Sequence, residues 1–435
     1  MLSRALGAAQ GSYLAALAVV AAVDLRIAAV VLAIGALGVA WTSVRRRRPS
    51  APDWSGLTRF LNFVGIATVG SLVLSVGLAT VGLPSSATPP RPATAGPFDA
   101  PDIYLVLLDG YPRADTLKSA RGFDNSEFLE EADRLGFDLA ERAHSNYNRT
   151  GLTLASFLNA APIDDLMPNP PGGIVAQNRW LSSLISRASA VQVARQLGYE
   201  FVHLPTDVAY LTPWSADRLI DAGQLSAFEY QVMANGLLTE HPTYSMIPLF
   251  RADHAQRILG TFEALEGLAQ EASAGPRLVF AHVMAPHHPI VFRRDGTAVT
   301  VDDCYWEDCN LAEPLSESLK ADVVEQIEFT STLVLNTART IIDASPGSVV
   351  VFFSDHGFRH WLGDGSETFR SLLLAHTPDH PSLFPATSTP VNVIPRILNA
   401  YLGTTQPLAD ESFWATTAGA ESYFPLRTFT TEPSP

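Results

Sequence analysis

Runs of strand length that are mostly hydrophobic recur along the chain after residue 100. The most uniform, at 349–353, contains only valine and phenylalanine and has no polar face, as expected of a strand that is buried on both sides of a sheet. These runs cover residues 102–108, 200–204, 277–283, 349–353 and 369–375, with a further one at 137–143. Stretches with helical periodicity separate them at residues 126–136, 175–198, 252–272, 315–344 and 391–401. The alternation predicts an α/β fold in which a mainly parallel sheet lies between helices.

The first 83 residues have a different pattern. Nearly uncharged runs at 5–23, 27–44 and 60–83 would each span roughly 27 to 36 Å as a helix, enough to cross a bilayer. A block of arginines at 45–48 is expected on the cytoplasmic side, which places everything after residue 83 outside. A cleaved signal peptide is the alternative for the first run, but the third run would still deliver the rest outside. We therefore predict a multi-pass protein of the cell membrane with an extracytoplasmic domain.

Composition sets the expected order of parts. The membrane region, residues 1–83, is followed by a linker at 84–101 that is rich in proline, alanine, serine and threonine and should be extended. A soluble domain at 102–405 and a C-terminal extension at 406–435 complete the chain. The net charge of −15 argues against a nucleic-acid partner.

Two cysteines, Cys304 and Cys309, lie in one acidic loop. They are too few for a structural zinc site of their own. With the domain outside the cytoplasm, a disulfide between them is favoured over free thiols.

Acidic and histidine side chains stand where two of the predicted strands end. Asp109 follows the run at 102–108, and Asp355 with His356 follows the run at 349–353. Parallel strands end at the same edge of a sheet, where α/β proteins bind ligands, so these side chains are expected to share one site. A simple turn-opening role is the alternative for Asp109, which precedes a glycine.

Two further side chains are candidates for the same site. His287 follows the strand at 277–283 and is flanked by prolines that restrict the backbone, which favours a site role. Thr150 is expected at or near the start of an apolar helix, where the first N–H groups favour an anion. Its hydroxyl group can be a nucleophile, and it can equally be an N-cap.

In order and type, these residues resemble the alkaline phosphatase superfamily, and within it the sulfatase-like branch that includes lipoteichoic acid synthases and phosphoethanolamine transferases. Lipoteichoic acid synthases and phosphoethanolamine transferases are also tethered by N-terminal membrane helices. The resemblance covers roughly residues 101–405 and includes the later segments at 369–373 and 390–393. It implies an alkaline phosphatase-like fold and a divalent metal ion bound by the following side chains: Asp109, Thr150, Asp355 and His356.

The resemblance also implies roles. Thr150 would form a covalent ester with the transferred group, and His287 would bind its oxygens or protonate the leaving group. His360 is a weaker candidate for the same substrate-binding role. Carboxylates with one imidazole favour zinc or manganese, with magnesium possible.

The sequence differs from the motifs of sulfatases and of two-metal phosphatases, which narrows the expected chemistry. True sulfatases need a cysteine or serine that is converted to formylglycine, with proline two and arginine four positions later. Here those positions hold Thr150, Leu152 and Leu154, and a β-branched threonine cannot become that aldehyde. The full ligand set of a two-metal phosphatase is also missing, which favours one essential metal ion.

Three functions remain open on the sequence. The first is a membrane-anchored transferase that moves a phosphoglycerol- or phosphoethanolamine-type group from a membrane lipid donor to an envelope glycan or lipid acceptor. The second is a hydrolase of phosphate or sulfate esters that uses the same residues. The third is a noncatalytic envelope interaction module on a degenerate scaffold.

Overall fold

Strand β1 lies at the centre of the sheet that organises this protein. The computed structural model describes residues 100–225, 247–299, 317–357, 366–416 and 422–429. Within these residues, a seven-stranded sheet has the order β2-β7-β6-β1-β5-β3-β4. Its strands are β1 (Ile103–Leu108), β2 (Asp138–Leu139), β3 (Glu200–Leu204), β4 (Arg218–Leu219), β5 (Arg277–Val283), β6 (Val349–Phe353) and β7 (Leu373–His376).

The sheet is mixed and mostly parallel. β1 pairs in parallel with β5 and β6, and β3 pairs in parallel with β5 and β4. Only at one edge does the direction reverse within the described sheet, where β7 is antiparallel to both β6 and β2. The predicted α/β fold with a mainly parallel sheet is confirmed.

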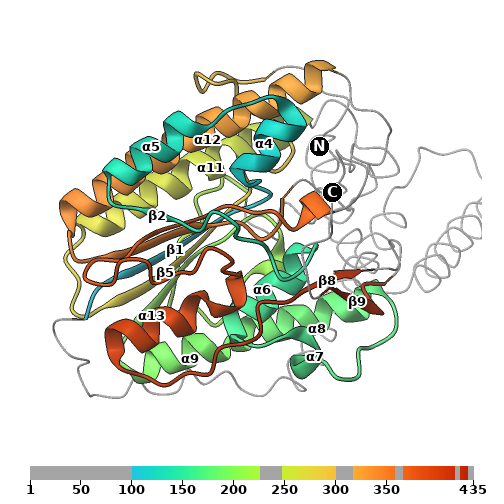
Figure 1. The fold of residues 1–435 in the computed structure, drawn as a ribbon, viewed down its shortest axis with the longest axis vertical. Helices are drawn as coiled ribbons and strands as arrows, with labels where there is room; N and C mark the ends of the chain where they lie inside the picture. The colour runs from blue at the N-terminus through green and yellow to red at the C-terminus, as the bar shows by residue number, and fades with distance from the viewer. Residues whose placement is uncertain (1–99, 226–246, 300–316, 358–365, 417–421, 430–435) are drawn as a thin grey trace, which may run out of the picture. The chain divides into compact units, whose positions relative to one another are not determined.

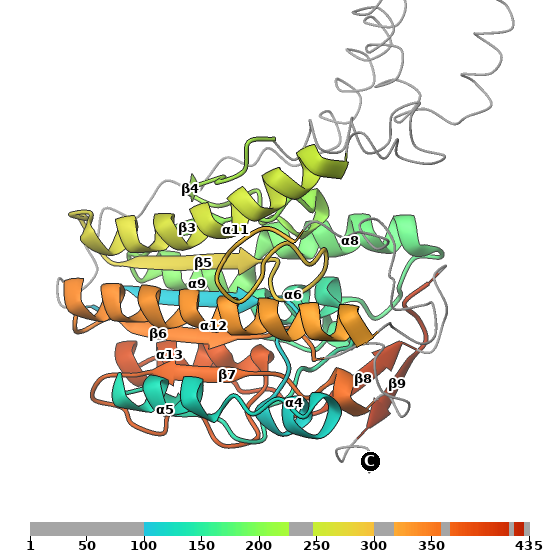
Figure 2. The ribbon, with the colours of Figure 1, turned by 90° about the horizontal axis from the view of Figure 1, so that it is seen from above.

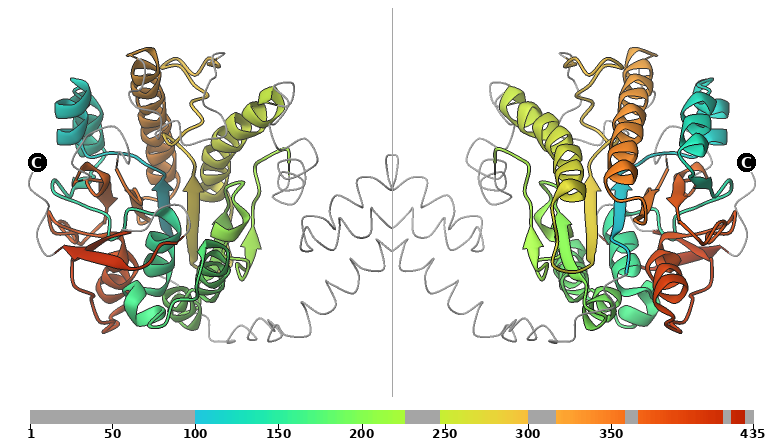
Figure 3. Two further views of the ribbon diagram at one scale, coloured as in Figure 1. Left: turned by 90° about the vertical axis from the view of Figure 1, so that its right-hand side faces the viewer. Right: turned by 90° about the vertical axis from the view of Figure 1, so that its left-hand side faces the viewer.

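Helices cover both faces of the sheet (Figure 1). One layer contains α4 (Ala114–Arg121), α5 (Ser126–Arg134), α11 (Ile247–Gln270) and α12 (Glu317–Ala344). The opposite layer contains α6 (Thr150–Asn159), α7 (Ile163–Leu166), α8 (Ile174–Arg187), α9 (Ser189–Gln196) and α13 (Val393–Leu402). Figures 2 and 3 show the same two layers from above and from both sides.

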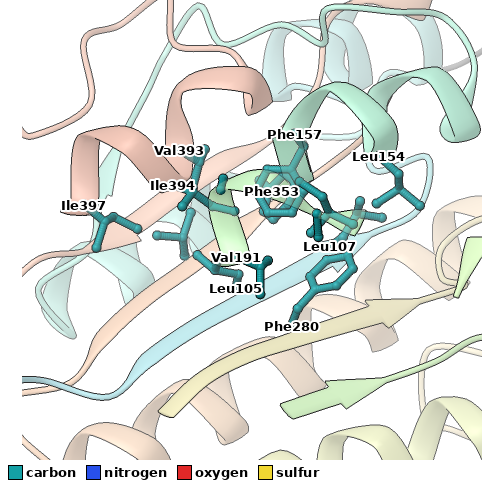
Figure 4. Close-up of a cluster of buried hydrophobic side chains, with 14 of the residues drawn as sticks. Leu105, Leu107, Leu154, Phe157, Val191, Phe280, Phe353, Val393, Ile394 and Ile397 are labelled. Atoms are coloured by element: carbon teal, nitrogen blue, oxygen red, sulfur yellow. The ribbon is translucent and has the colours of Figure 1, made fainter. Parts of the chain in front are cut away.

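Successive side chains of β1 point to opposite faces of the sheet, so this strand packs against both helix layers. Leu105 and Leu107 belong to the hydrophobic cluster beneath α6, α9 and α13, whereas Tyr104 and Val106 belong to the cluster beneath α5, α11 and α12. Figure 4 shows the first cluster, in which Phe353 lies against side chains of α6 and α13. Because successive strand residues point to opposite faces, a run that is apolar throughout is buried twice.

Several predicted boundaries need correction. The helical stretch at 175–198 is two helices, because the chain turns at Ala188 with a φ of 42° and the Ser189 N–H is donated to Asn159 Oδ1. The strand expected at 369–375 begins only at Leu373. Before it, Arg370 and Ser371 make isolated bridges to other segments instead of a continuous ladder.

Several predictions fall outside the described residues. They concern the hydrophobic runs of the first 83 residues, nearly all of the linker, both cysteines and His360. Among the helices that the structure does describe, none has the length and hydrophobicity needed to cross a membrane. Part of the predicted C-terminal extension is described and forms a separate two-stranded sheet of β8 (Phe413–Thr416) and β9 (Leu426–Phe429).

Candidate metal centre

Side chains from the ends of three adjacent strands converge at the carboxyl edge of the sheet. Asp109 follows β1, Asp355 and His356 follow β6, and His287 lies beyond β5. His356 Nε2 is 3.3 Å from Asp109 Oδ1 and 3.4 Å from Asp355 Oδ2. Potential ligand atoms of Asp109, His287 and His356 all lie within 4.8 Å of one another. The expected meeting of the strand-end residues therefore occurs.

Each carboxylate at the centre has one oxygen that the protein satisfies and one that it does not. Asp355 Oδ1 accepts the Gly110 N–H at 3.1 Å, and Asp109 Oδ2 lies 3.0 Å from His282 Nε2. Asp109 Oδ1 and Asp355 Oδ2 are buried and accept no hydrogen bond from any described residue. Buried carboxylate oxygens are costly unless a donor or a cation compensates them. Both oxygens face His356 Nε2, so this pocket of negative charge fits a divalent cation.

The histidine tautomers support the same assignment. His356 Nδ1 is 2.8 Å from the Gly357 carbonyl oxygen, and His287 Nδ1 is 2.7 Å from the His288 carbonyl oxygen. A carbonyl oxygen only accepts, so each Nδ1 carries a proton, and a neutral His356 ring presents a lone pair at Nε2. Metal-binding histidines usually donate their second nitrogen in this way. Zinc or manganese suits this mixture of carboxylate and imidazole donors.

Electrostatics keeps Asp109 ionised. Burial raises the pKa of its carboxyl group, but the charge of a protonated His287 and the hydrogen bond from His282 outweigh burial and hold that pKa well below its ordinary value. The side chain is therefore a carboxylate at neutral pH, as metal binding requires.

Two glycines let the backbone pass close to the centre. Gly110 has a φ of 72°, and a Cβ there would lie 3.3 Å from His356 Cε1. At Gly357 a Cβ would overlap with the carbonyl oxygens of Glu367 and Arg370. The Asp-Gly and Asp-His-Gly sequences thus combine ligand side chains with the only residue type that these turns accommodate.

Thr150 is the first residue of α6, and Arg149 takes the N-cap position. The alternative role of Thr150 as an N-cap therefore does not apply. One turn later, Thr153 Oγ1 donates a hydrogen bond of 3.1 Å to the carbonyl oxygen of Asp355. This contact fixes the first turn of α6 against the end of β6. Coordination of the metal by the Thr150 oxygen stays a prediction.

The C-terminal extension holds the segment that leads into Thr150. The Trp414 ring stacks on Tyr147 with centroids 5.2 Å apart, and the main-chain N–H of Trp414 is donated to the Asn146 carbonyl oxygen at 2.8 Å. The Thr416 N–H is donated to Asn148 Oδ1 at 3.1 Å. Strand β8 is thus part of the support for the candidate nucleophile, which its position at the end of the chain did not indicate.

We expect Trp414→Ala to lower the free energy of unfolding by about 2 kcal/mol, because a stacked and partly buried aromatic ring is lost. The backbone amides of the segment that leads into Thr150 should exchange their hydrogens faster as that segment loosens. Chemical denaturation and hydrogen exchange measure the two effects. Trp214→Ala is the matched control, since Trp214 is 55% exposed and its loss should change either quantity little. Equal effects of the two substitutions would contradict the proposed support.

A buried glutamine braces the loop that carries His287. Gln326, on α12, is 0% exposed. Its Oε1 accepts the N–H groups of Val291 and Phe292 at 2.7 and 3.2 Å. Its Nε2 donates to the carbonyl oxygens of Pro286 and His287 at 3.2 and 3.0 Å. The sequence does not single it out, because Thr330, Ser331 and Thr337 are further polar residues on the buried side of the same helix.

Gln326→Glu should destabilise the protein by about 2 to 3 kcal/mol, because a carboxylate cannot donate to the two carbonyl oxygens and is left buried. Metal affinity should fall as the His287 loop loses its brace. Thermal unfolding and metal titration of the variant test this. Gln192→Glu is the control. The Gln192 side chain donates a single, solvent-exposed hydrogen bond to the Arg187 carbonyl oxygen. An unchanged unfolding midpoint for Gln326→Glu would be the contrary result.

Fold and site together define an α/β protein with a candidate divalent-metal centre at the carboxyl edge of its sheet. No protein-family profile and no curated protein matches the sequence. Solved structures do resemble it, and they include phosphoethanolamine transferases and sulfatases, of the branch whose motifs the sequence resembles.

The C-terminal periplasmic domain of EcEptC from Escherichia coli has 13% identity and a TM-score of 0.47, over 77% of this chain and 94% of that one. The same domain is also known as a complex with Zn. The periplasmic domain of phosphoethanolamine transferase EptC from Campylobacter jejuni has 11% identity and a TM-score of 0.44, covering 70% and 90% of the two chains. A putative sulfatase from Bacteroides thetaiotaomicron has 13% identity and a TM-score of 0.45, over 73% of this chain and 78% of that one. With identities this low, the roles of individual residues rest on this chain's own contacts.

Proposed function

We propose that this protein is a membrane-anchored, metal-dependent transferase that moves a phosphoryl-linked group from a membrane lipid to an envelope glycan or lipid. One observation carries the proposal. Two buried carboxylate oxygens without hydrogen bonds meet the Nε2 of His356 beside the first turn of α6. Buried carboxylate oxygens without a hydrogen-bond donor are costly, and a bound divalent cation would compensate both of them.

The proposed metal ligands are Asp109, Asp355 and His356, with Thr150 as a further one. When bound, a divalent cation favours ionisation of a hydroxyl group and offsets negative charge on phosphoryl oxygens. The protein's own part is to fix the two carboxylates and to exclude water. The side chains of Asp109 and His356 are each 2% exposed, so the site is dry and its electrostatic interactions are strong.

In the proposed first half-reaction, the Thr150 hydroxyl group gives up its proton to solvent and Thr150 Oγ1 attacks the phosphorus of the donor lipid. A Thr150 oxygen–phosphorus bond forms, the bond to the lipid glycerol oxygen breaks, and that oxygen takes a proton from protonated His287. In the second half-reaction an acceptor hydroxyl group gives its proton to the now neutral His287 and attacks the same phosphorus, and Thr150 leaves as the alkoxide. His287 is suited to meet substrate, because its side chain is 18% exposed while Asp109 beside it is 2% exposed.

The location outside the cytoplasm and the choice of a lipid donor belong to the same proposal. Support comes from the three hydrophobic runs before residue 83 and the arginine block at 45–48. A short proline-rich linker at 84–101 would keep the domain close to the bilayer surface, where a lipid donor lies.

The test uses the full chain in detergent with phospholipids that carry a labelled phosphoethanolamine or phosphoglycerol headgroup. We expect release of diacylglycerol and label on the peptide that contains Thr150. Adding an acceptor with hydroxyl groups should then move the label to the acceptor. Label that passes to water at the same rate with and without acceptor would indicate the hydrolase instead. If the protein binds metal but neither labelled peptide nor diacylglycerol is formed, the result would favour the noncatalytic interaction module.

A further inference from the structure

Three histidines surround Asp109, and one of them differs from the others in its protonation pattern. His282 is 2% exposed on β5, and its Nε2 lies 3.0 Å from Asp109 Oδ2. A carboxylate oxygen accepts hydrogen bonds and donates none, so this Nε2 carries the proton. At His287 and His356 the proton is on Nδ1, next to a carbonyl oxygen. His282 is therefore a donor to the centre, whereas His356 in its neutral form offers it a lone pair.

The backbone fixes this donor relative to its acceptor. Leu107 and His282 are paired in the parallel register of β1 and β5. The pairing continues past the strand ends, since the Asp109 N–H is donated to the Val283 carbonyl oxygen at 2.9 Å. The His287 N–H is in turn donated to the Asp109 carbonyl oxygen at 2.9 Å. Asp109 thus has its main chain and one side-chain oxygen held by β5 and the loop that follows it.

Holding Oδ2 decides where the other oxygen points. With Oδ2 engaged by His282, Oδ1 is directed at His356 Nε2, 3.3 Å away, and accepts no hydrogen bond from a described residue. If the Asp109 carboxylate were able to rotate, it would turn that oxygen away and leave the cation with one ligand fewer. The hydrogen bond from His282 removes this freedom before the metal arrives.

We propose that His282 is a positioning residue that holds Asp109 in its metal-binding orientation and thereby sets the affinity of the centre for a divalent cation. This inference rests on the metal centre of the proposed function and assigns to His282 a role that the sequence did not indicate. Loss of such an outer partner typically weakens metal binding by about 10- to 100-fold.

The test compares two substitutions that differ by one methylene group. In His282→Gln the side-chain amide N–H reaches about as far as Nε2 and should restore the hydrogen bond. In His282→Asn the amide is too short to reach Asp109 Oδ2. His203→Asn is the matched control, because His203 is 1% exposed on β3 and its Nδ1 donates to the Phe280 carbonyl oxygen, away from the centre.

Zn²⁺ affinity is measured on the full chain in detergent by competition with a chromophoric chelator, without any substrate. We expect His282→Asn to lose about 10- to 100-fold in affinity, while His282→Gln and His203→Asn stay within a few-fold of the natural protein. The inference fails if His282→Asn binds Zn²⁺ as tightly as the natural protein, or if His203→Asn loses as much. Thermal unfolding of the metal-free forms checks that each variant is folded. Failure of the natural protein to bind Zn²⁺ or Mn²⁺ at all would overturn the proposed function as well.

Discussion

Thr150→Ala is expected to reduce transfer by about 10⁴-fold or more, the scale on which enzymes lose activity when a covalent nucleophile is removed. The fold should survive, because Arg149 and not Thr150 is the N-cap of α6 and the helix keeps the anchoring hydrogen bond from Thr153 to Asp355. Label from a headgroup-labelled phospholipid should no longer appear on the protein. Intact-protein mass spectrometry and diacylglycerol release measure both outcomes.

Two variants make this result interpretable. Thr150→Ser keeps a hydroxyl group and should retain a measurable part of the activity, with label on the new serine. Thr340→Ala removes a threonine from an exposed face of α12, where its hydroxyl donates only to the Asn336 carbonyl oxygen of the same helix, and should have no effect. Transfer by Thr150→Ala at a tenth of the natural rate or more would exclude Thr150 as the nucleophile.

Asp355→Asn should abolish high-affinity metal binding, with a loss of about 100-fold or more, because a ligand is expected to matter at least as much as an outer partner. The substitution removes the negative charge at Oδ2, and the side-chain oxygen that accepts the Gly110 N–H can remain. Zn²⁺ should therefore raise the unfolding temperature of the natural protein but not that of the variant, since only a bound ligand stabilises the folded state.

In the absence of metal, the order of unfolding temperatures of the natural protein and Asp355→Asn should be reversed or the two should be equal. Without a cation, an asparagine amide at residue 355 relieves the repulsion between two buried carboxylates, so the variant should be as stable as the natural protein or more so. Asp253→Asn is the matched control. Asp253 is equally buried but accepts the N–H groups of Gln224 and Leu225 at 2.6 and 2.7 Å, away from the centre. The Asp253→Asn variant should therefore have a lower unfolding temperature than the natural protein and the same metal affinity. A Zn²⁺-induced rise in Asp355→Asn equal to that of the natural protein would refute the assignment.

The sequence predicted the sheet and the strand-end residues because both depend on local pattern. An apolar run such as 349–353 is buried as a strand inside the sheet, and a polar residue placed directly after it must lie at the edge of the sheet. Asp109, Asp355 and His356 were found on that basis. The start of α6 at Thr150 followed in the same way from polar residues that lead into an apolar helix.

The supporting residues were not predicted, because their partners are far away in the chain. His282 reads as one polar residue inside a strand, and its acceptor lies 173 residues earlier. Gln326 holds a loop some 40 residues before it. The stacking of Trp414 on Tyr147 joins the C-terminal extension to the Thr150 segment. Hydrophobic periodicity carries no information on such pairs, which only the folded chain brings together.

Anomalous diffraction at the zinc absorption edge, from crystals of the full chain grown with Zn²⁺, would locate the metal ion itself. We predict one strong peak at the carboxyl edge of the sheet, about 2.0 to 2.2 Å from Asp109, Asp355 and His356, with the Thr150 oxygen completing the coordination. A map with no peak between these side chains, or with the Thr150 oxygen beyond coordinating distance of the metal, would contradict the proposed centre.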